Sequence, residues 1–261
     1  MTKGEAKILV LGDICGNCGT EAVESKLWGI RKDLGVDMVI ANGENCAEGN
    51  GLDRSSAERL FSCGVDVITS GNHIWKKSSA HSLLENNGFV IRPANYPSSR
   101  PGAGYCIYDM NSYKVLVMNL LGTVYMESLD SPFYTADKIL AREEGNYDFA
   151  ILDIHAEATS EKIALAKYLD GRVTAVFGTH THVQTADEKV LAKGTGYITD
   201  AGMCGPVDSI LGVKNEIIIR KFLTKMPARH EEASGDAMIN GCLFTVSTEN
   251  YRCIKAERIS L

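Results

Sequence analysis

The chain has no long hydrophobic run, no basic tract and only six histidines. The first apolar run, residues 8–11, ends at Gly12 and Asp13, and it is far shorter than the apolar part of a signal peptide or a membrane span. We therefore expect a cytoplasmic protein that does not bind membranes. The net charge is −6, which argues against a stable nucleic-acid complex held by many phosphate contacts. A small anionic substrate is still compatible with this charge, because a bound cation can attract it locally.

Length and composition are those of a globular protein. A chain of 261 residues with 44% hydrophobic residues is long enough to bury a full core. Since we find no linker, repeat or low-complexity segment, we predict a single domain spanning residues 1–261. The eight cysteines are scattered along the chain, and without a secretion signal we expect them to be reduced and mostly buried.

Short apolar runs alternate with segments of helical periodicity. The runs predict strands at residues 7–11, 37–41, 66–69, 148–154 and 174–177, and the intervening segments predict helices at 21–34, 55–63, 77–86 and 160–169. This alternation predicts an α/β fold with a largely parallel sheet covered by helices. Residues 105–110 with 113–120, and 241–247 with 251–259, are typical of hairpins, so antiparallel strands are expected to join the parallel ones.

Polar side chains follow every predicted parallel strand. The segments concerned are Gly12-Asp13, Asn42-Gly43-Glu44-Asn45, Gly71-Asn72-His73, His155-Ala156-Glu157 and His180-Thr181-His182. Ligands of open α/β sheets bind beyond the carboxyl ends of the strands, so we expect these groups to meet at one edge of one sheet. In a strand, residues two positions apart point to the same face, which would let the side chains of His180 and His182 converge on one ion or ligand.

The chemistry of these side chains predicts a metal site. Carboxylate, amide and imidazole donors indicate a site for manganese, iron or zinc rather than a cysteine-rich structural zinc site. There are more donors than one tetrahedral ion needs, but they suit two ions about 3.5–4 Å apart, the arrangement of many phosphoester hydrolases. Glu44 is the candidate bridging ligand, because it follows the strand between those that precede Asp13 and Asn72.

The motifs resemble a known family. GD, NGEN, GNH, a lone histidine and GTHTH resemble the calcineurin-like metallophosphoesterase superfamily. The longer segments GNHIW, RPANYP, HAEATSEK, GTHTHVQTAD and TDAGMCGP, between residues 71 and 206, resemble its bacterial YmdB-like subgroup. Two departures from the wider superfamily, Cys15 where a histidine is usual and Glu44 where an aspartate is usual, also resemble the subgroup, although a cysteine at position 15 is less expected.

The resemblance implies a four-layer α/β/β/α sandwich with mixed sheets. It also implies that the protein is a phosphodiesterase that acts on 2′,3′-cyclic nucleotides and other small phosphodiesters. It implies two transition-metal ions per chain, for which iron or manganese is preferred to zinc, and a metal-bridging hydroxide that attacks in line with the phosphorus. His73 would be the general acid. One ion would be held by Asp13, Glu44, Asn45 and His182, and the other by Glu44, Asn72, His155 and His180. A homo-oligomer is compatible with the sequence.

Other functions remain open at this point. The same metals would serve a phosphomonoesterase or a nuclease, and a metal- or nucleotide-binding regulator would need no catalysis at all. Cys15-x-x-Cys18, between a strand and a helix, also resembles a thioredoxin-type redox motif, although redox chemistry would leave the histidines unexplained. Cys15 itself is either a small buried residue, which we favour, or a soft additional ligand.

Several further residues have weaker signals. Ser160 is expected to cap the following helix, and Glu161 to lie in its first turn, where a carboxylate favours the helix dipole. Arg92 and Asn95 either contact the substrate or belong to a loop stiffened by prolines. Asp200 is expected behind the ligands or beside the substrate, and Glu157 is given no role. His81 and His230 match no motif and are expected at the surface.

Overall fold

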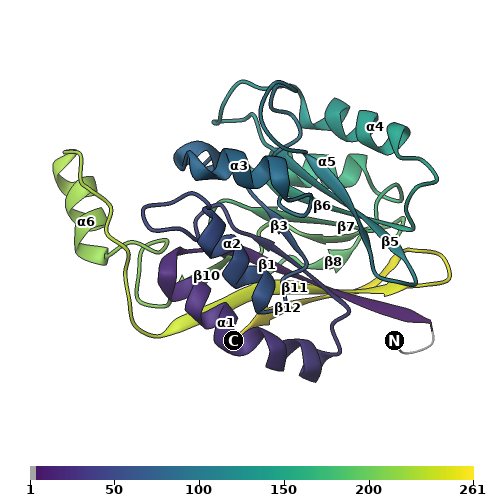
Figure 1. The fold of residues 1–261 in the computed structure, drawn as a ribbon, viewed down its shortest axis with the longest axis horizontal. Coiled ribbons are helices and arrows are strands. Elements are labelled where there is room, and N and C mark those ends of the chain that lie inside the picture. The colour runs from purple at the N-terminus through teal and green to yellow at the C-terminus, as the bar shows by residue number, and fades with distance from the viewer. Residues whose placement is uncertain (1–3) are drawn as a thin grey trace.

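Two six-stranded sheets form the centre of the protein in the computed structural model, which describes residues 4–261 (Figure 1). The strands are β1 (Glu5–Ile14), β2 (Met38–Asn42), β3 (Val67–Thr69), β4 (Tyr105–Asp109), β5 (Lys114–Leu121), β6 (Phe149–His155), β7 (Ala175–Thr179), β8 (Lys189–Val190), β9 (Gly196–Ile198), β10 (Met203–Pro206), β11 (Ala237–Ser247) and β12 (Cys253–Ser260). The α-helices are α1 (Gly16–Leu34), α2 (Arg54–Ser62), α3 (Ser79–Asn86), α4 (Pro132–Arg142), α5 (Thr159–Tyr168) and α6 (Asn215–Thr224), and a 3₁₀-helix spans Ile74–Lys76.

Both sheets mix parallel and antiparallel pairs. The first has the order β12-β11-β10-β1-β2-β3, in which β1 pairs in parallel with β2 and β10 and antiparallel with β11. The second has the order β4-β5-β6-β7-β9-β8, in which β5, β6, β7 and β9 are parallel. Helical crossovers between parallel neighbours leave helices on the outer faces of the sheets.

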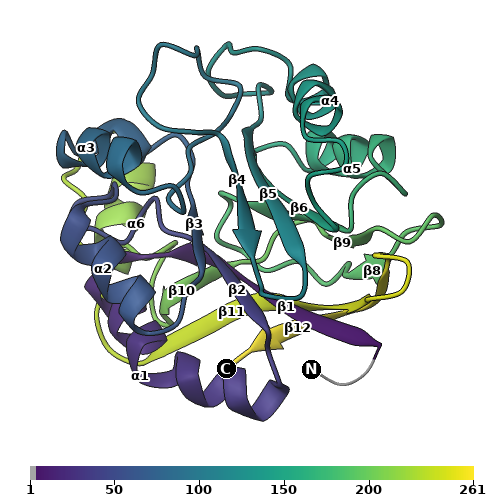
Figure 2. The ribbon, with the colours of Figure 1, turned by 45° about the vertical axis from the view of Figure 1, so that its right-hand side comes forward.

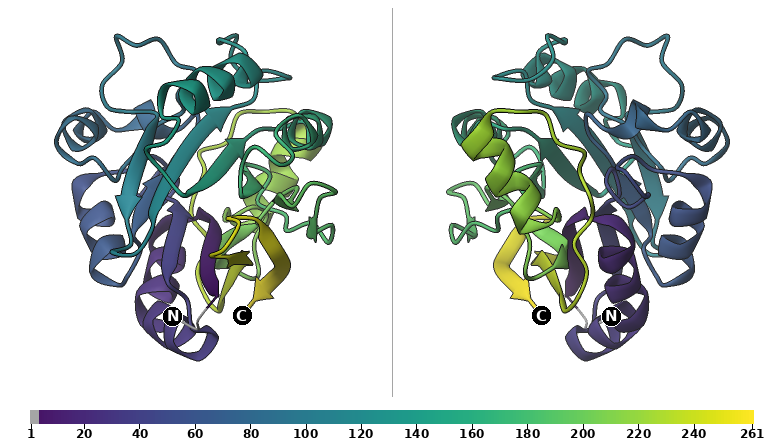
Figure 3. Two further views of the ribbon diagram at one scale, coloured as in Figure 1. Left: turned by 90° about the vertical axis from the view of Figure 1, so that its right-hand side faces the viewer. Right: turned by 90° about the vertical axis from the view of Figure 1, so that its left-hand side faces the viewer.

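The side chains of each central strand alternate between two cores. On β1, Ile8 and Val10 face the core between the sheets, whereas Leu9 and Leu11 pack against α1, α2 and α3. On β6, Phe149 and Ile151 again face the inner core, and Leu152 packs towards α4 and α5. The central strands of each sheet are therefore buried on both faces, and the order helix, sheet, sheet, helix gives four layers (Figures 2 and 3).

The predicted fold class is confirmed, with one correction to the position of the strands. The expected strands and both hairpins are present. The strands preceding His155 and His180, however, lie in the second sheet, and those preceding Asp13, Glu44 and Asn72 lie in the first. The expectation of one sheet edge was therefore wrong, because local hydrophobic patterns carry no information on which strands pair.

Helix boundaries show smaller differences. The helix predicted to begin at residue 21 begins at Gly16, so Cys18 lies in its first turn, and the helix predicted to begin at residue 77 begins at Ser79. The sequence patterns did not single out α4, α6 or the short strands β8, β9 and β10.

Within residues 4–261, no helix combines the length and the apolar character that crossing a bilayer requires.

Replacing a buried aromatic side chain of the inner core should destabilise the protein strongly. Phe149 is fully buried between the sheets, and we expect Phe149→Ala to lower the free energy of unfolding by about 3–5 kcal/mol, through lost burial and the cavity left behind. Phe222 on α6 is 65% exposed, so Phe222→Ala should change it by about 0.5 kcal/mol or less. Urea denaturation of both variants measures the difference, and equal losses would contradict the assigned core.

Candidate metal centre

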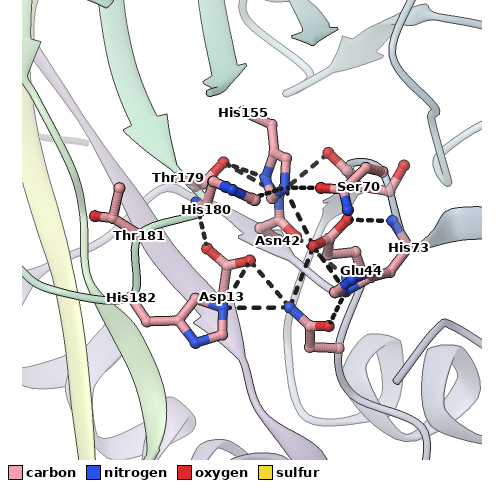
Figure 4. Close-up of polar contacts among 12 residues, drawn as sticks. Asp13, Asn42, Glu44, Ser70, His73, His155, Thr179, His180, Thr181 and His182 are labelled. Atoms are coloured by element: carbon pink, nitrogen blue, oxygen red, sulfur yellow. Dashed lines mark hydrogen bonds and ion pairs between the residues drawn. The ribbon is translucent and has the colours of Figure 1, made fainter. Parts of the chain in front are cut away.

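The carboxyl ends of strands from both sheets bring the predicted ligands together. Asp13 lies near the end of β1, Glu44 and Asn45 follow β2, and Asn72 follows β3. His155 is the last residue of β6, and His180 and His182 follow β7. Figure 4 shows the labelled side chains of Asp13, Glu44, His155, His180 and His182 pointing at one another.

The first group of donors surrounds Nε2 of His155. This atom lies 3.1 Å from Oε1 of Glu44, 3.1 Å from Oδ1 of Asn72 and 3.1 Å from Nδ1 of His180. Glu44 and His155 are buried. One ligand atom from each of Glu44, His155 and His180 lies within 4.8 Å of the others, a cluster able to hold a metal ion.

The second group of donors lies around the amide of Asn45. Its Nδ2 is 3.3 Å from Oδ1 of Asp13, 3.2 Å from Oε1 of Glu44 and 3.3 Å from Nε2 of His182. Nε2 of His182 is also 3.5 Å from Oδ1 of Asp13. The same oxygen of Glu44 therefore belongs to both groups.

These contacts fit cations better than they fit hydrogen bonds alone. A neutral imidazole nitrogen either donates one proton or accepts one, yet Nε2 of His155 faces three polar atoms at the same distance. The two carboxylates of Asp13 and Glu44 are buried, and burying two charges is unfavourable unless positive charge compensates them. A Cβ at Gly71 would collide with His155 and Glu44, so the backbone also closes tightly over the first group.

Nearby charges shift the pKa values of the central groups. Burial alone would raise the pKa of Asp13, but the charge of His182 and its hydrogen bond hold it well below its ordinary range. Burial opposes the charged form of His155 too, but the charge of Glu44 raises the pKa of this imidazole. The site therefore favours positive charge beside its carboxylates.

His180 and His182 converge on the centre for a different reason than predicted. Both lie beyond the end of β7, with φ angles of 98° and 64°, so strand geometry does not align them. His180 directs Nδ1 to His155, and His182 directs Nε2 to Asp13. Positive φ is strained for a residue other than glycine, and such strain is concentrated at functional sites.

Each imidazole is also held from its far side. Nε2 of His180 lies 3.2 Å from Oε2 of Glu157, and Nδ1 of His182 lies 3.3 Å from the carbonyl oxygen of Leu211. Partners of this kind fix the orientation of a ligating imidazole and the position of its proton. Glu157 therefore lies behind a predicted ligand, a position that the sequence did not indicate.

His73 adjoins the cluster but is more exposed than most of its members. Its backbone N–H donates to Oε2 of Glu44 over 2.8 Å, and its Nδ1 lies 2.7 Å from Oδ1 of Asn45 and 3.3 Å from Oε1 of Glu44. Burial lowers the pKa of His73 below its ordinary value, although Glu44 opposes this effect.

A buried polar network, which the sequence motifs did not indicate, supports His155 from behind. Nδ1 of His155 lies 2.9 Å from Oγ1 of Thr179, which donates to Asp153 over 2.7 Å. Asn42 donates to Asp153 over 3.0 Å and accepts from the backbone N–H of Glu44. Burial raises the pKa of Asp153 to about 6. The available signal was an aspartate in the middle of an otherwise apolar strand.

A buried ion pair fixes the segment that carries His180 and His182. Nζ of Lys162 lies 2.7 Å from Oδ2 of Asp200 and donates to the carbonyl oxygen of Thr179 over 2.8 Å. Oδ2 of Asp200 also accepts from the backbone N–H and the hydroxyl of Thr181. Asp200 is therefore a supporting residue rather than a member of either donor group, and Lys162 had not been singled out.

The cysteines do not have the surroundings of a redox site. All eight are free, and all except Cys18 are buried, which agrees with the expected reduced thiols. Burial raises the pKa values of Cys15 and Cys18, whereas reactive cysteines have lowered ones. Sγ of Cys15 lies 3.5 Å from Nδ1 of His182, the nitrogen that faces away from Asp13, so Cys15 packs against a donor from behind.

The weaker predictions have mixed outcomes. Ser160 does not cap α5, whose N-cap is Ala158 without a side-chain bond. Arg92 and Asn95 are buried and bind backbone carbonyls, as expected of a rigid loop. Glu161 lies in the first turn of α5 as predicted, but it is buried and accepts a hydrogen bond from the backbone N–H of Thr123. The helix dipole therefore does not fully explain why a carboxylate lies at this position. His81 and His230 are exposed, as predicted.

Comparisons with known proteins show the family of this chain and agree with its fold. A family model described as YmdB-like protein matches residues 9–259. A 2′,3′-cyclic-nucleotide 2′-phosphodiesterase of Bacillus subtilis is 41% identical over 97% of this chain and 96% of its own length. The crystal structure of a hypothetical protein from Thermus thermophilus has a TM-score of 0.92 at 41% identity, covering 98% of each chain. That of a novel phosphatase from Mycoplasma pneumoniae has a TM-score of 0.93 at 35% identity, covering 98% of this chain and 93% of that one.

Removing one partner of the Lys162–Asp200 pair should be costly. Lys162→Met leaves the carboxylate of Asp200 buried without its counter-charge, so we expect the free energy of unfolding to fall by about 3–5 kcal/mol. In Lys162→Met/Asp200→Asn neither member of the pair is charged, so no unpaired charge is left at these two positions and part of the loss should be recovered. Urea denaturation of wild type and both variants tests this, and a single variant as stable as wild type would contradict a buried charge pair.

Proposed function

The chain belongs to the YmdB-like family, and from this membership and the donor cluster we propose that it is a metal-dependent phosphodiesterase acting on 2′,3′-cyclic nucleotides. It is a hydrolytic phosphoesterase, as its relatives are named phosphodiesterase and phosphatase. The finer assignment draws on the cyclic-nucleotide specificity in the name of the Bacillus subtilis relative. The observation that carries it is the single oxygen of Glu44 shared by two donor groups.

Each donor group would hold one ion. Asp13, Asn45 and His182 would hold the first together with Glu44, and Asn72, His155 and His180 would hold the second together with Glu44. The oxygen and nitrogen donors suit iron or manganese, and zinc is also compatible with them. Bound together, two such ions supply an activated water nucleophile and neutralise the charge that builds up on the phosphoryl oxygens.

Asn45 must present its oxygen to act as a ligand, since an amide nitrogen has no free lone pair to offer. Its Nδ2 faces Asp13, Glu44 and His182, and its Oδ1 faces Nδ1 of His73. Exchanging the two ends by a half-turn of the amide directs Oδ1 to the ion and makes Nδ2 donate to His73. Nδ1 of His73 would then be an acceptor, and the neutral imidazole would carry its proton on Nε2.

His73 is suited to protonate the departing ribose oxygen. Its backbone is fixed by the hydrogen bond from its N–H to Glu44, yet its side chain is partly exposed, so a substrate can reach the imidazole. Opening a cyclic phosphate breaks one bond from phosphorus to a ribose oxygen, and that oxygen needs a proton as it leaves. A histidine in this position favours an enzyme over a purely binding protein.

A phosphomonoesterase or nuclease would use the same donors, so substrate comparison distinguishes them. The protein should open 2′,3′-cyclic AMP faster than it cleaves either a nucleoside monophosphate or single-stranded RNA. Two ions per chain in protein purified without chelator would support the dinuclear centre. A protein with both ions that hydrolyses no ester would instead be a binding protein.

Replacing the shared carboxylate should remove both metal and activity. Glu44→Gln keeps the size of the side chain but removes its charge, so metal content should fall and hydrolysis of bis-p-nitrophenyl phosphate should drop by at least about 100-fold. Glu157→Gln is the matched control, because this carboxylate contacts only the far side of His180. Glu157→Gln should keep both ions and lose less activity than Glu44→Gln. Two ions and full activity in Glu44→Gln would exclude the bridging role.

Replacing His73 should separate chemistry from metal binding. We expect His73→Ala to keep both ions and to lose about 10²–10⁴-fold in turnover of 2′,3′-cyclic AMP, the usual contribution of a general acid. The loss should be smaller with bis-p-nitrophenyl phosphate, because a phenolate leaves without much protonation. Metal analysis and steady-state kinetics on both esters test this.

The alternative outcomes for His73→Ala are informative. Loss of metal would make His73 a ligand. An equal loss of turnover on both esters would indicate that His73 positions the substrate rather than donating a proton.

A further inference from the structure

The segment between β5 and α4 contains a turn at residues 122–126 that leaves its sheet beside the metal centre. Leu121, the last residue of β5, pairs with His155 in the sheet. The backbone N–H of Gly122 donates to the carbonyl oxygen of His155 over 2.9 Å, and that of Met126 donates to the carbonyl oxygen of Thr123. In Figure 2 this teal segment lies near the top of the view, before α4. The turn is thus tied directly to a residue of the cluster.

The buried carboxylate of Glu161 holds the first half of the turn. It accepts from the backbone N–H of Thr123 over 2.9 Å, from the hydroxyl of Thr123 over 3.0 Å, and from the backbone N–H of Val124 over 3.2 Å. Hydrogen bonds to an ionised group are about twice as strong as neutral ones. One buried side chain therefore fixes the backbone of two consecutive residues of the turn.

Asn95 holds both ends of the same segment. Its Oδ1 accepts from the N–H of Leu121 over 2.9 Å, and its Nδ2 donates to the carbonyl oxygens of Leu121 and Asp130 over 2.8 and 3.0 Å. Asn95 is buried. Two buried polar side chains from different parts of the chain therefore fix one short loop.

The fixed turn presents an aromatic residue to solvent. Tyr125 is 89% exposed and has a φ of 62°, a left-handed conformation that is uncommon for a residue with a bulky side chain. Strained backbone persists only where surrounding structure enforces it, and it is concentrated at binding and active sites. The core does not use this ring, because almost all of it is in contact with solvent.

We propose that Tyr125 is the stacking surface for the nucleobase of the substrate. The inference deepens the proposed function, because it assumes a nucleotide with its phosphate at the metal centre. Tyr125 is three positions after Gly122, which keeps their Cα atoms within about 11 Å. The N–H of Gly122 is hydrogen-bonded to the carbonyl oxygen of His155, and a nucleotide extends from its phosphate through the ribose to the base. We therefore expect a base whose phosphate lies at the centre to reach the turn that carries Tyr125.

Stacking also determines what the site would select. Every base has an aromatic face, so stacking on a tyrosine tolerates all four bases. The substrate class is then nucleoside 2′,3′-cyclic phosphates in general. Small cyclic phosphates without a base would bind more weakly.

The test compares Tyr125→Ala and Tyr125→Phe on two substrates with fully metal-loaded protein. The substrates are 2′,3′-cyclic AMP and ribose 2,3-cyclic phosphate, which has the same reacting group but no base. Tyr125→Ala should raise KM for 2′,3′-cyclic AMP by roughly 5- to 100-fold with little change in kcat, the signature of lost binding shared by ground and transition states. It should leave the base-free ester unaffected, and Tyr125→Phe should restore the wild-type KM.

Tyr134→Ala is the matched control, since Tyr134 is a tyrosine on α4 that is 71% exposed. Its KM values should equal those of wild type. Unchanged KM in Tyr125→Ala, or an equal rise on both substrates, would overturn the stacking role while wild-type activity left the proposed function intact. A metal-loaded wild type that hydrolyses neither ester would overturn the proposed function and this inference together.

Discussion

Two buried carboxylates, those of Asp13 and Glu44, lie close together where the two sheets meet, and much of the surrounding structure compensates their charge. Backbone N–H groups of His73 and His180 donate to them, and imidazoles approach from both sheets. Placing such charges in a low-dielectric interior costs several kcal/mol per ion unless positive charge is near. The arrangement is therefore more costly without cations than with them, which is why the donor set is best explained by metal binding.

The supporting network keeps this arrangement rigid. Asp153 with Thr179 holds His155, and Lys162 with Asp200 holds the segment that carries His180 and His182 with positive φ. Ligands must be held within a fraction of an ångström to select and orient metals, and side chains behind them supply that precision. Stability and function are connected here, because the buried pair of Lys162 and Asp200 also positions the segment that carries two donors.

Interpretations of single residues succeeded where a local rule was sufficient. A strand followed by Asp, Asn, Glu or His indicated a site at the carboxyl ends, and each predicted donor does lie in the cluster. Glu161 and Asn95 show where such rules fail. Position in a first helical turn or in a proline-containing loop says nothing of a partner elsewhere in the chain, and both side chains fix the segment after β5. Asp153 and Lys162 were missed for the same reason.

The sequence by itself determined most of the strands, the two hairpins, the donor types and the family resemblance, because hydrophobic periodicity, turn residues and motif spacing are local properties. Tertiary structure alone decided that the donors come from two sheets, that Glu44 lies between two groups, and that positive φ rather than strand alternation directs His180 and His182. It also decided which polar residues are buried behind them. Strand pairing and burial depend on contacts between residues far apart in the chain, and their free energies are set only when the sheets pack together.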